Sequence, residues 1–190
     1  WKACSDENTV VCMHIGSSSQ MVITADDAPI NVMITLQPMN LVQAASDLLW
    51  SRVLQKFPKL KFAMSEGDIG WIPYFLQRAE HTLDRHNGWM KQQQPQGLRP
   101  TELFRERIIV CFIEDRVGVQ LLDSFNIDNV CWESDYPHSD SWWPTAPERL
   151  VELFDGVDDA VVAQITHENA MRHFQFDPFA HRARDRCTAG

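Results

Sequence analysis

Titratable side chains lie at the ends of four short apolar runs in this chain of 190 residues. Histidine nitrogens and carboxylate oxygens are suitable ligands for Zn²⁺ or Mn²⁺, and a catalytic metal commonly keeps one position open for water or substrate. His14 and Asp135 offer such atoms after the first and fourth runs, so far apart in the sequence that only the fold could bring them together. The residues at the four run ends are, in order, His14; Ser65 and Glu66; Glu114 and Asp115; and Asp135 with His138.

His14 and Asp135 also have ordinary structural interpretations. A single histidine on an apolar run is typical of a core residue whose ring nitrogens are hydrogen-bonded. An aspartate after a strand often caps a helix or a turn. Titratable groups nevertheless recur at corresponding positions of all four runs, which favours a metal site when His14 and Asp135 are taken together.

The runs that carry these residues are predicted to be β-strands separated by amphipathic helices. Such an alternation is what parallel βα units require, and the loops after the strands of a parallel sheet or barrel converge on one face. We therefore expect the strand-end residues to meet at one end of the sheet. The predicted strands span 9–15, 60–64, 108–112 and 129–133. The predicted helices span 41–57 with Asn40 as the N-cap, 72–86, the region around 103–106, 117–125, 147–154 and 158–174.

The length of the chain is close to the usual domain size of ~150 residues, which predicts a single domain over residues 1–190. The segment from Ser17 to Met39 is expected to be irregular and could close over a site as a lid. Residues 91–100 are polar and predicted to form a surface excursion. Residues 175–190 are predicted to form a C-terminal tail.

The composition disfavours two classes of partner, nucleic acid and anionic membranes. Lys and Arg total 17 against 26 Asp and Glu, and the formal net charge of −9 makes nucleic acid and anionic membranes poor partners. No apolar stretch approaches the ~20 residues that a membrane span needs. The five cysteines form no Cys-x-x-Cys pair, which favours a cytoplasmic location. Three of them lie in apolar runs and are expected to be buried: Cys12, Cys111 and Cys131.

Four segments of the sequence carry a family resemblance. SEGDIGWIPYFLQRAEHTLDRH (65–86) and VCWESDYPHSDSWWP (130–144) resemble late strand-and-loop signatures of the amidohydrolase-related family of metal-dependent hydrolases and decarboxylases. This family includes aminocarboxymuconate semialdehyde decarboxylase and the resorcylate decarboxylases. VCMHIGSSS (11–19) resembles the end of the family's fifth strand, and THENAMRHFQFD (166–177) resembles its C-terminal helix. The resemblance covers nearly the whole chain.

The resemblance implies an α/β fold, namely the second half of a (β/α)₈ TIM barrel. The four predicted strands map onto the family's strands five to eight. A typical barrel needs ~250 residues, so the first half is expected to be absent from this chain. Other family members supply two more metal ligands from the first strand, and no such pair exists here. The expected partners are therefore the N-terminal half of the barrel, as a separate chain or as missing residues, and further copies in an oligomer.

The resemblance also implies roles for the strand-end residues. His14 is similar to the family's fifth-strand metal ligand, and Asp135 to the eighth-strand aspartate that ligates the metal or holds its water during catalysis. Glu66 stands where the family usually has a catalytic histidine, so it is expected to move protons or join the metal ligands, or to serve only the turn that follows it. His138 is expected to orient substrate or to cap its loop. An aromatic substrate pocket is one interpretation, and core packing the commoner one, of Trp71, Tyr136 and Trp142.

The expected function is therefore metal-dependent hydrolysis or non-oxidative decarboxylation of a small carboxylated or cyclic substrate, performed together with the N-terminal half of the barrel. The expected cofactor is a divalent metal ion, with Zn²⁺ favoured and Mn or Fe as alternatives. A second hypothesis is a non-catalytic binding or assembly subunit, because a half barrel exposes strand edges that another chain must cover. A third is an independent doubly wound sheet, although no glycine-rich phosphate loop follows any strand.

Overall fold

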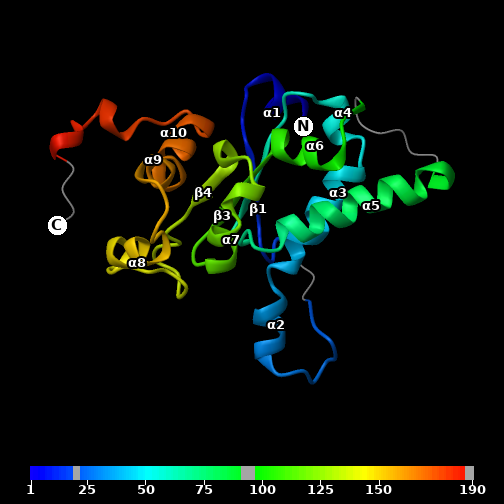
Figure 1. Cartoon of the computed structure of the whole chain (residues 1–190), viewed down its shortest axis with the longest axis horizontal. Helices are drawn as coiled ribbons and strands as arrows, with labels where there is room; N and C mark the ends of the chain where they lie inside the picture. Colours follow the sequence, from blue (N-terminus) through cyan, green and yellow to red (C-terminus); the bar gives the residue numbers. More distant parts are fainter. Residues whose placement is uncertain (19–21, 91–96, 187–190) are drawn as a thin grey trace.

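A parallel sheet of four strands forms the centre of the molecule (Figure 1). The computed structural model describes residues 1–18, 22–90 and 97–186. The strands lie side by side in the order of the sequence, each paired in parallel with the next. A doubly wound sheet reverses its strand order at a switch point, and the described sheet contains no such reversal. The strands are β1 (Val11–His14), β2 (Phe62–Ser65), β3 (Ile108–Phe112) and β4 (Val130–Trp132).

Three helices pack on one face of the sheet (Figure 1): α3 (Met39–Trp50), α5 (Ile72–Met90) and α6 (Pro100–Arg107). Strand residues alternate between the two faces, and every second one contributes to the main core. Burying one Val, Leu, Ile, Phe or Met side chain stabilises the fold by about 1.5–3 kcal/mol. The sheet residues of this core are Phe62, Met64, Ile108, Val110, Phe112 and Val130, which pack with Leu41, Ala45, Leu76 and Leu103 of the helices.

The opposite face of the sheet carries a smaller cluster. Ala63, Ile109, Cys111 and Cys131 are buried there, with Val10 and Ala170 packed against them. The expected burial of Cys111 and Cys131 is confirmed. The expectation for Cys12 was wrong, because Cys12 lies on the edge strand β1, where its thiol is exposed.

The segment from Ser17 to Met39 contains a helix that the sequence did not predict, α2 (Ile30–Leu36). None of its residues is buried, although most are apolar, and Ile30 and Ile34 are both exposed. The helix expected over 41–57 instead begins at Met39, with Asn40 inside its first turn, and ends at Trp50. A short helix, α4 (Val53–Lys56), follows it.

The remaining elements lie before, between and after the strands, and three of them contribute Val119, Leu153 and Ile165 to the main core. Residues 117–125 form a shorter helix than expected, followed by a 3-10 turn, and residues 158–174 are interrupted by a π-helical turn. Residues 91–96 of the expected excursion and 187–190 of the expected tail lie outside the described residues, and Pro100 already begins α6. In the described part of the chain, no helix has both the length and the apolar character to cross a membrane. The elements described in addition to the strands and α2 to α6 are α1 (Lys2–Asp6), α7 (Arg116–Gln120), Leu122–Ser124, Ile127–Asn129, α8 (Ala146–Leu153), α9 (Asp159–Ala163), Gln164–Glu168, α10 (Asn169–His173), Pro178–Ala180 and Arg184–Arg186.

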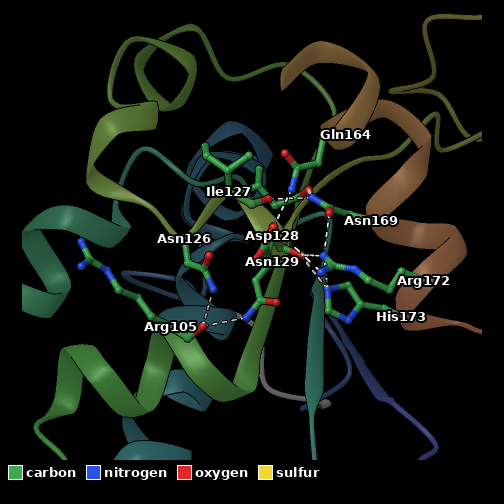
Figure 2. Close-up of polar contacts among 10 residues, drawn as sticks. Arg105, Asn126, Ile127, Asp128, Asn129, Gln164, Asn169, Arg172 and His173 are labelled. Carbon is green, nitrogen blue, oxygen red and sulfur yellow. Dashed lines mark hydrogen bonds and ion pairs between the residues drawn. The ribbon is translucent and has the colours of Figure 1, made fainter. Parts of the chain in front are cut away.

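A network of hydrogen bonds ties α10 to the turn before β4 (Figure 2). The buried Asn169 side chain donates to the carbonyls of Ile127, at 2.6 Å, and Val130, at 2.7 Å. His173 Nε2 lies 2.8 Å from the carbonyl of Asp128, which also accepts a hydrogen bond from Arg172. These contacts fix the C-terminal helix against the last strand of the sheet.

His173 gives this network a pH dependence. Burial lowers the pKa of His173 below its ordinary value of 6.5, and the positive charges of Lys61 and Arg172 lower it further, against the opposing effect of Asp128. The folded protein therefore binds a proton less readily than the unfolded chain. The resulting stability is fully present above the unfolded pKa and is lost as the pH falls from 6.5 towards the lowered folded pKa.

We expect the free energy of unfolding, measured by urea denaturation between pH 8 and pH 5, to decrease below about pH 6.5. A His173→Gln variant keeps a side-chain donor for the Asp128 carbonyl without a titrating group, so its stability should decrease less over the same range. Parallel curves for the two proteins would contradict the prediction.

Candidate active site

A cleft of about 800 Å³ lies at the carboxyl ends of the strands. Residues from the loops after all four strands line it, including Ile15, Glu66, Ile113 and His138. The expected convergence of the strand ends is therefore found in the structure. Ile34, Thr35, Gln37 and Pro38, at the end of α2 and just beyond it, form a further wall, so part of the segment expected to be a lid borders the cleft.

Glu66, Asp135 and His138 come together in this region. One potential ligand atom from each lies within 4.8 Å of the others, which makes them a group that could hold a metal ion. Asp135 Oδ2 is 2.7 Å from His138 Nδ1, and this contact raises the pKa of the exposed His138. The backbones at Glu66 and Asp135 both take positive φ angles, 59° and 52°, directly after β2 and near the end of β4.

His14 lies beside this group, on the far side of Glu66. Its Nε2 is 2.6 Å from Glu66 Oε1, and its Nδ1 is 2.7 Å from the carbonyl of Ile15. The hydrogen bond to Ile15 is the main cause that raises the pKa of His14. Burial is the main cause that raises the pKa of Glu66, followed by its hydrogen bond with Asp135. The structure thus brings His14 to the site through Glu66, not as one of the three clustered residues.

Glu133 is a further member of the site that sequence reasoning missed. Its carboxylate accepts a hydrogen bond from the backbone N–H of Glu66, and burial raises its pKa to about 7. The signal was present in the sequence, because Glu133 is a carboxylate at the end of the predicted fourth strand, two positions before Asp135. Glu133 still donates its own backbone N–H to the carbonyl of Phe112, which continues the β4 pairing.

Asp115, expected among the strand-end groups, instead holds the loop after β2 in place. Its Oδ2 accepts from the backbone N–H groups of Ile69, at 2.7 Å, and Gly70, at 2.6 Å. Its Oδ1 accepts from Gly118, at 2.7 Å, and so caps α7. A side chain at Gly118 would meet Ile69 at 2.2 Å, so the close contact of α7 with this loop requires glycine. Asp115 therefore positions the segment that follows Glu66.

Of the three aromatic residues expected at a substrate pocket, one lines the cleft. Trp142 is buried and donates from Nε1 to Glu114 Oε2 at 3.2 Å. Trp71 is not among the lining residues, because its Nε1 donates to the carbonyl of Gly67 at 2.8 Å and its ring packs on Phe75. Tyr136 is also absent from the lining; it is exposed and packs edge-on against Trp143, with ring centroids 5.4 Å apart.

Carboxylates dominate the wall of the cleft. Asp68 lies two residues after Glu66, and burial raises its pKa to about 7, with further contributions from Asp115, Asp140 and Glu114. Asp140 and Glu114 line the same cleft. Arg149, on α8, is the one lysine or arginine among the described lining residues. The cleft is therefore an acidic pocket with a single permanent positive charge.

Comparison with known proteins extends this description. A family model described as amidohydrolase matches residues 1–176. No curated protein sequence matches the chain. Among solved structures, an amidohydrolase from Mycobacterium avium subsp. paratuberculosis aligns with a TM-score of 0.75 at 16% identity, over 92% of this chain and 44% of that protein.

Two decarboxylases align similarly. The 5-carboxyvanillate decarboxylase of Sphingomonas paucimobilis has a TM-score of 0.69 at 18% identity, over 93% of this chain and 52% of that one. The dihydroxybenzoic acid decarboxylase of Polaromonas, solved with bound manganese and 2-nitroresorcinol, has a TM-score of 0.66 at 18% identity, over 92% and 52%. The chain thus spans about half the length of the structures it matches.

Proposed function

Because the chain belongs to the amidohydrolase family, we propose that it carries the metal-binding face of a metal-dependent hydrolase or non-oxidative decarboxylase. The substrate would be a small carboxylated or cyclic molecule. The observation that supports this most strongly is the group of Glu66, Asp135 and His138, whose ligand atoms lie within 4.8 Å of one another at the carboxyl ends of the strands. The strand ends are where barrel enzymes place their catalytic residues.

The chemistry of this group fits a divalent cation. Two carboxylates and an imidazole are donors that Zn²⁺, Mn²⁺ and Fe²⁺ all accept, with Zn²⁺ favoured. The carboxylates of Glu66 and Asp135 lie close together, and Asp135 helps to raise the pKa of Glu66. A cation bound between them would reduce the repulsion between the two negative charges. When bound, the ion would supply Lewis-acid polarisation of a substrate oxygen.

Side chains at the strand ends are proposed to bind the metal and to transfer protons. We assign Asp135 and His138 to holding the metal, with Glu66 as the third ligand. The Glu66 carboxylate has two oxygens, and its hydrogen bond to His14 Nε2 gives it a route by which a proton could be passed or returned. Glu66 is therefore also the proposed proton carrier, and His14 its partner. The role of His14 as a direct metal ligand stays a prediction.

The proposed enzyme needs more than this chain. In the described residues, β1 and β4 each pair with one neighbour only, so each leaves an unpaired edge on which further strands could build. Together with the half-length match to the solved structures, these edges support a barrel completed by an N-terminal half. Oligomerisation is a further expectation of this proposal.

Metal analysis tests the proposed function. The full-length protein is this chain together with the N-terminal half of the barrel, whether that half is a separate chain or missing residues. We expect it, when purified without chelators, to contain about one divalent ion, and to take the ion up again after chelation and addition of Zn²⁺ or Mn²⁺. Residues 1–190 alone should bind more weakly, because the expected first-strand ligands are missing. A full-length protein that neither retains nor regains a divalent ion would refute the proposal.

A further inference from the structure

Arg149 occupies an unusual position for a surface arginine. It lies on α8 and lines the acidic cleft, and its guanidinium carbon is 5.4 Å from the centre of the Trp142 ring. Among the described residues, it forms no ion pair with a carboxylate. The guanidinium is therefore held by an aromatic face, while its N–H groups have no anionic partner.

Trp142 is a rigid support for this guanidinium. Its side chain is only 5% exposed, and Nε1 donates to Glu114 Oε2. The backbone N–H of Thr145 donates to the Trp142 carbonyl at 2.8 Å, which fixes the start of α8 beside it. A cation within about 6 Å of an indole ring is attracted to its face, and a stacked guanidinium keeps its planar edge free for hydrogen bonding. The Arg149 side chain is thus partly ordered before any ligand binds.

The charges around the cleft restrict where an anion could bind. Asp68, Glu114 and Asp140 line the same space, so a carboxylate ligand would be repelled from their part of the wall. Arg149 is the one residue of the described lining that carries a permanent positive charge. An anionic group entering the cleft therefore meets its most favourable side chain at the α8 wall.

We propose that Arg149 is a specificity-determining residue that binds a carboxylate of the substrate at the α8 wall, with Trp142 as its support. The proposal rests on the proposed function, because it names the substrate class of the same cleft: a molecule that carries a carboxylate. Bidentate hydrogen bonding between guanidinium and carboxylate fixes orientation as well as affinity. Binding at this wall would orient a ring-shaped substrate within the cleft.

Binding of two probes to the metal-free, full-length protein tests the proposal. Benzoate and benzamide have the same shape and differ by one charge. We expect benzoate to shift the Nε1–H NMR resonance of Trp142, and to bind more tightly than benzamide at low salt. In an Arg149→Gln variant, benzoate affinity should fall about tenfold or more while that of benzamide is unchanged, since a hydrogen bond to a charged group is lost.

Two further variants sharpen the test. Arg149→Lys keeps the charge but not the planar fork, so it should bind benzoate with intermediate affinity. Arg78→Gln removes an exposed arginine of α5 that does not line the cleft, and should bind both probes as the wild type does. Equal benzoate affinity in the wild type and Arg149→Gln would overturn the proposal.

Because the titration is done without metal, its result is independent of the metal analysis. A protein that binds no divalent ion but loses benzoate affinity in Arg149→Gln would refute the proposed metal-dependent function and retain the carboxylate site. A protein that binds the ion but shows no preference for benzoate over benzamide would retain the proposed metal-dependent function and refute the carboxylate site at Arg149.

Discussion

Asp135→Asn is expected to reduce the affinity for a divalent ion by at least ~100-fold and to reduce turnover to a similar extent. Mutation of a residue that only supports a metal ligand typically lowers metal affinity by about 10–100-fold, and Asp135 is proposed as a ligand itself. Asparagine keeps the shape of aspartate and tolerates its left-handed backbone, so the loss would come from the missing negative charge. Metal titration by calorimetry and steady-state kinetics of the full-length protein measure the two effects.

The stability of the same variant separates this explanation from misfolding. Because Asp135 helps to raise the pKa of Glu66, removing its charge relieves a repulsion, and the melting temperature should stay equal or rise. Asp155→Asn, the same change at an exposed position, should leave metal affinity and stability unchanged. If metal binding and turnover of the assembled protein were unchanged by Asp135→Asn, this would instead support the hypothesis that this chain is a non-catalytic subunit.

Asp115→Ala is expected to lower the free energy of unfolding by about 2–3 kcal/mol, because one carboxylate serves three backbone N–H groups. Two of these N–H groups belong to Ile69 and Gly70, in the loop that follows Glu66. The variant should therefore also weaken metal binding, although Asp115 is not one of the three clustered residues. Urea denaturation and metal titration give the two quantities.

Asp158→Ala is a matched control for Asp115→Ala. Asp158 also caps a helix, accepting a hydrogen bond from the backbone N–H of Ala160 at the start of α9, but it serves only one such group. Its loss should cost about 1 kcal/mol and leave metal affinity unchanged. If the two variants were equally destabilised with equal metal affinity, Asp115 would be an ordinary helix cap.

The sheet could be predicted from the sequence because its strands are short apolar runs bounded by turn residues. Residues 108–112 were predicted as a strand and found as β3 with the same ends. Helices with a buried face, such as α5, were also recognisable. The exposed helix α2 was not, because it is only seven residues long and four of them, Ile30, Val32, Ile34 and Thr35, are β-branched, which lowers helix propensity. The π-helical turn at Gln164–Glu168 has no recognisable pattern.

The candidate site was predictable in its location but not in its contacts. The ends of parallel strands must converge, so Glu66, Asp135 and His138 could be expected near one another. Whether His14 would meet the group directly or through Glu66 depends on side-chain geometry that spacing does not determine. The same holds for Trp71, which is absent from the lining of the cleft and donates its indole N–H to Gly67, so its contact with a substrate stays a prediction.

The left-handed backbones at Glu66 and Asp135 suggest how this protein would respond to selection. Non-glycine residues in that conformation cost the fold free energy, of order 1 kcal/mol each, which glycine would not. A library screened for heat resistance alone should therefore accept glycine at positions 66 and 135, and every such gain would remove a carboxylate from the cluster. At these two positions, thermal stability favours glycine, whereas the proposed metal binding requires a carboxylate.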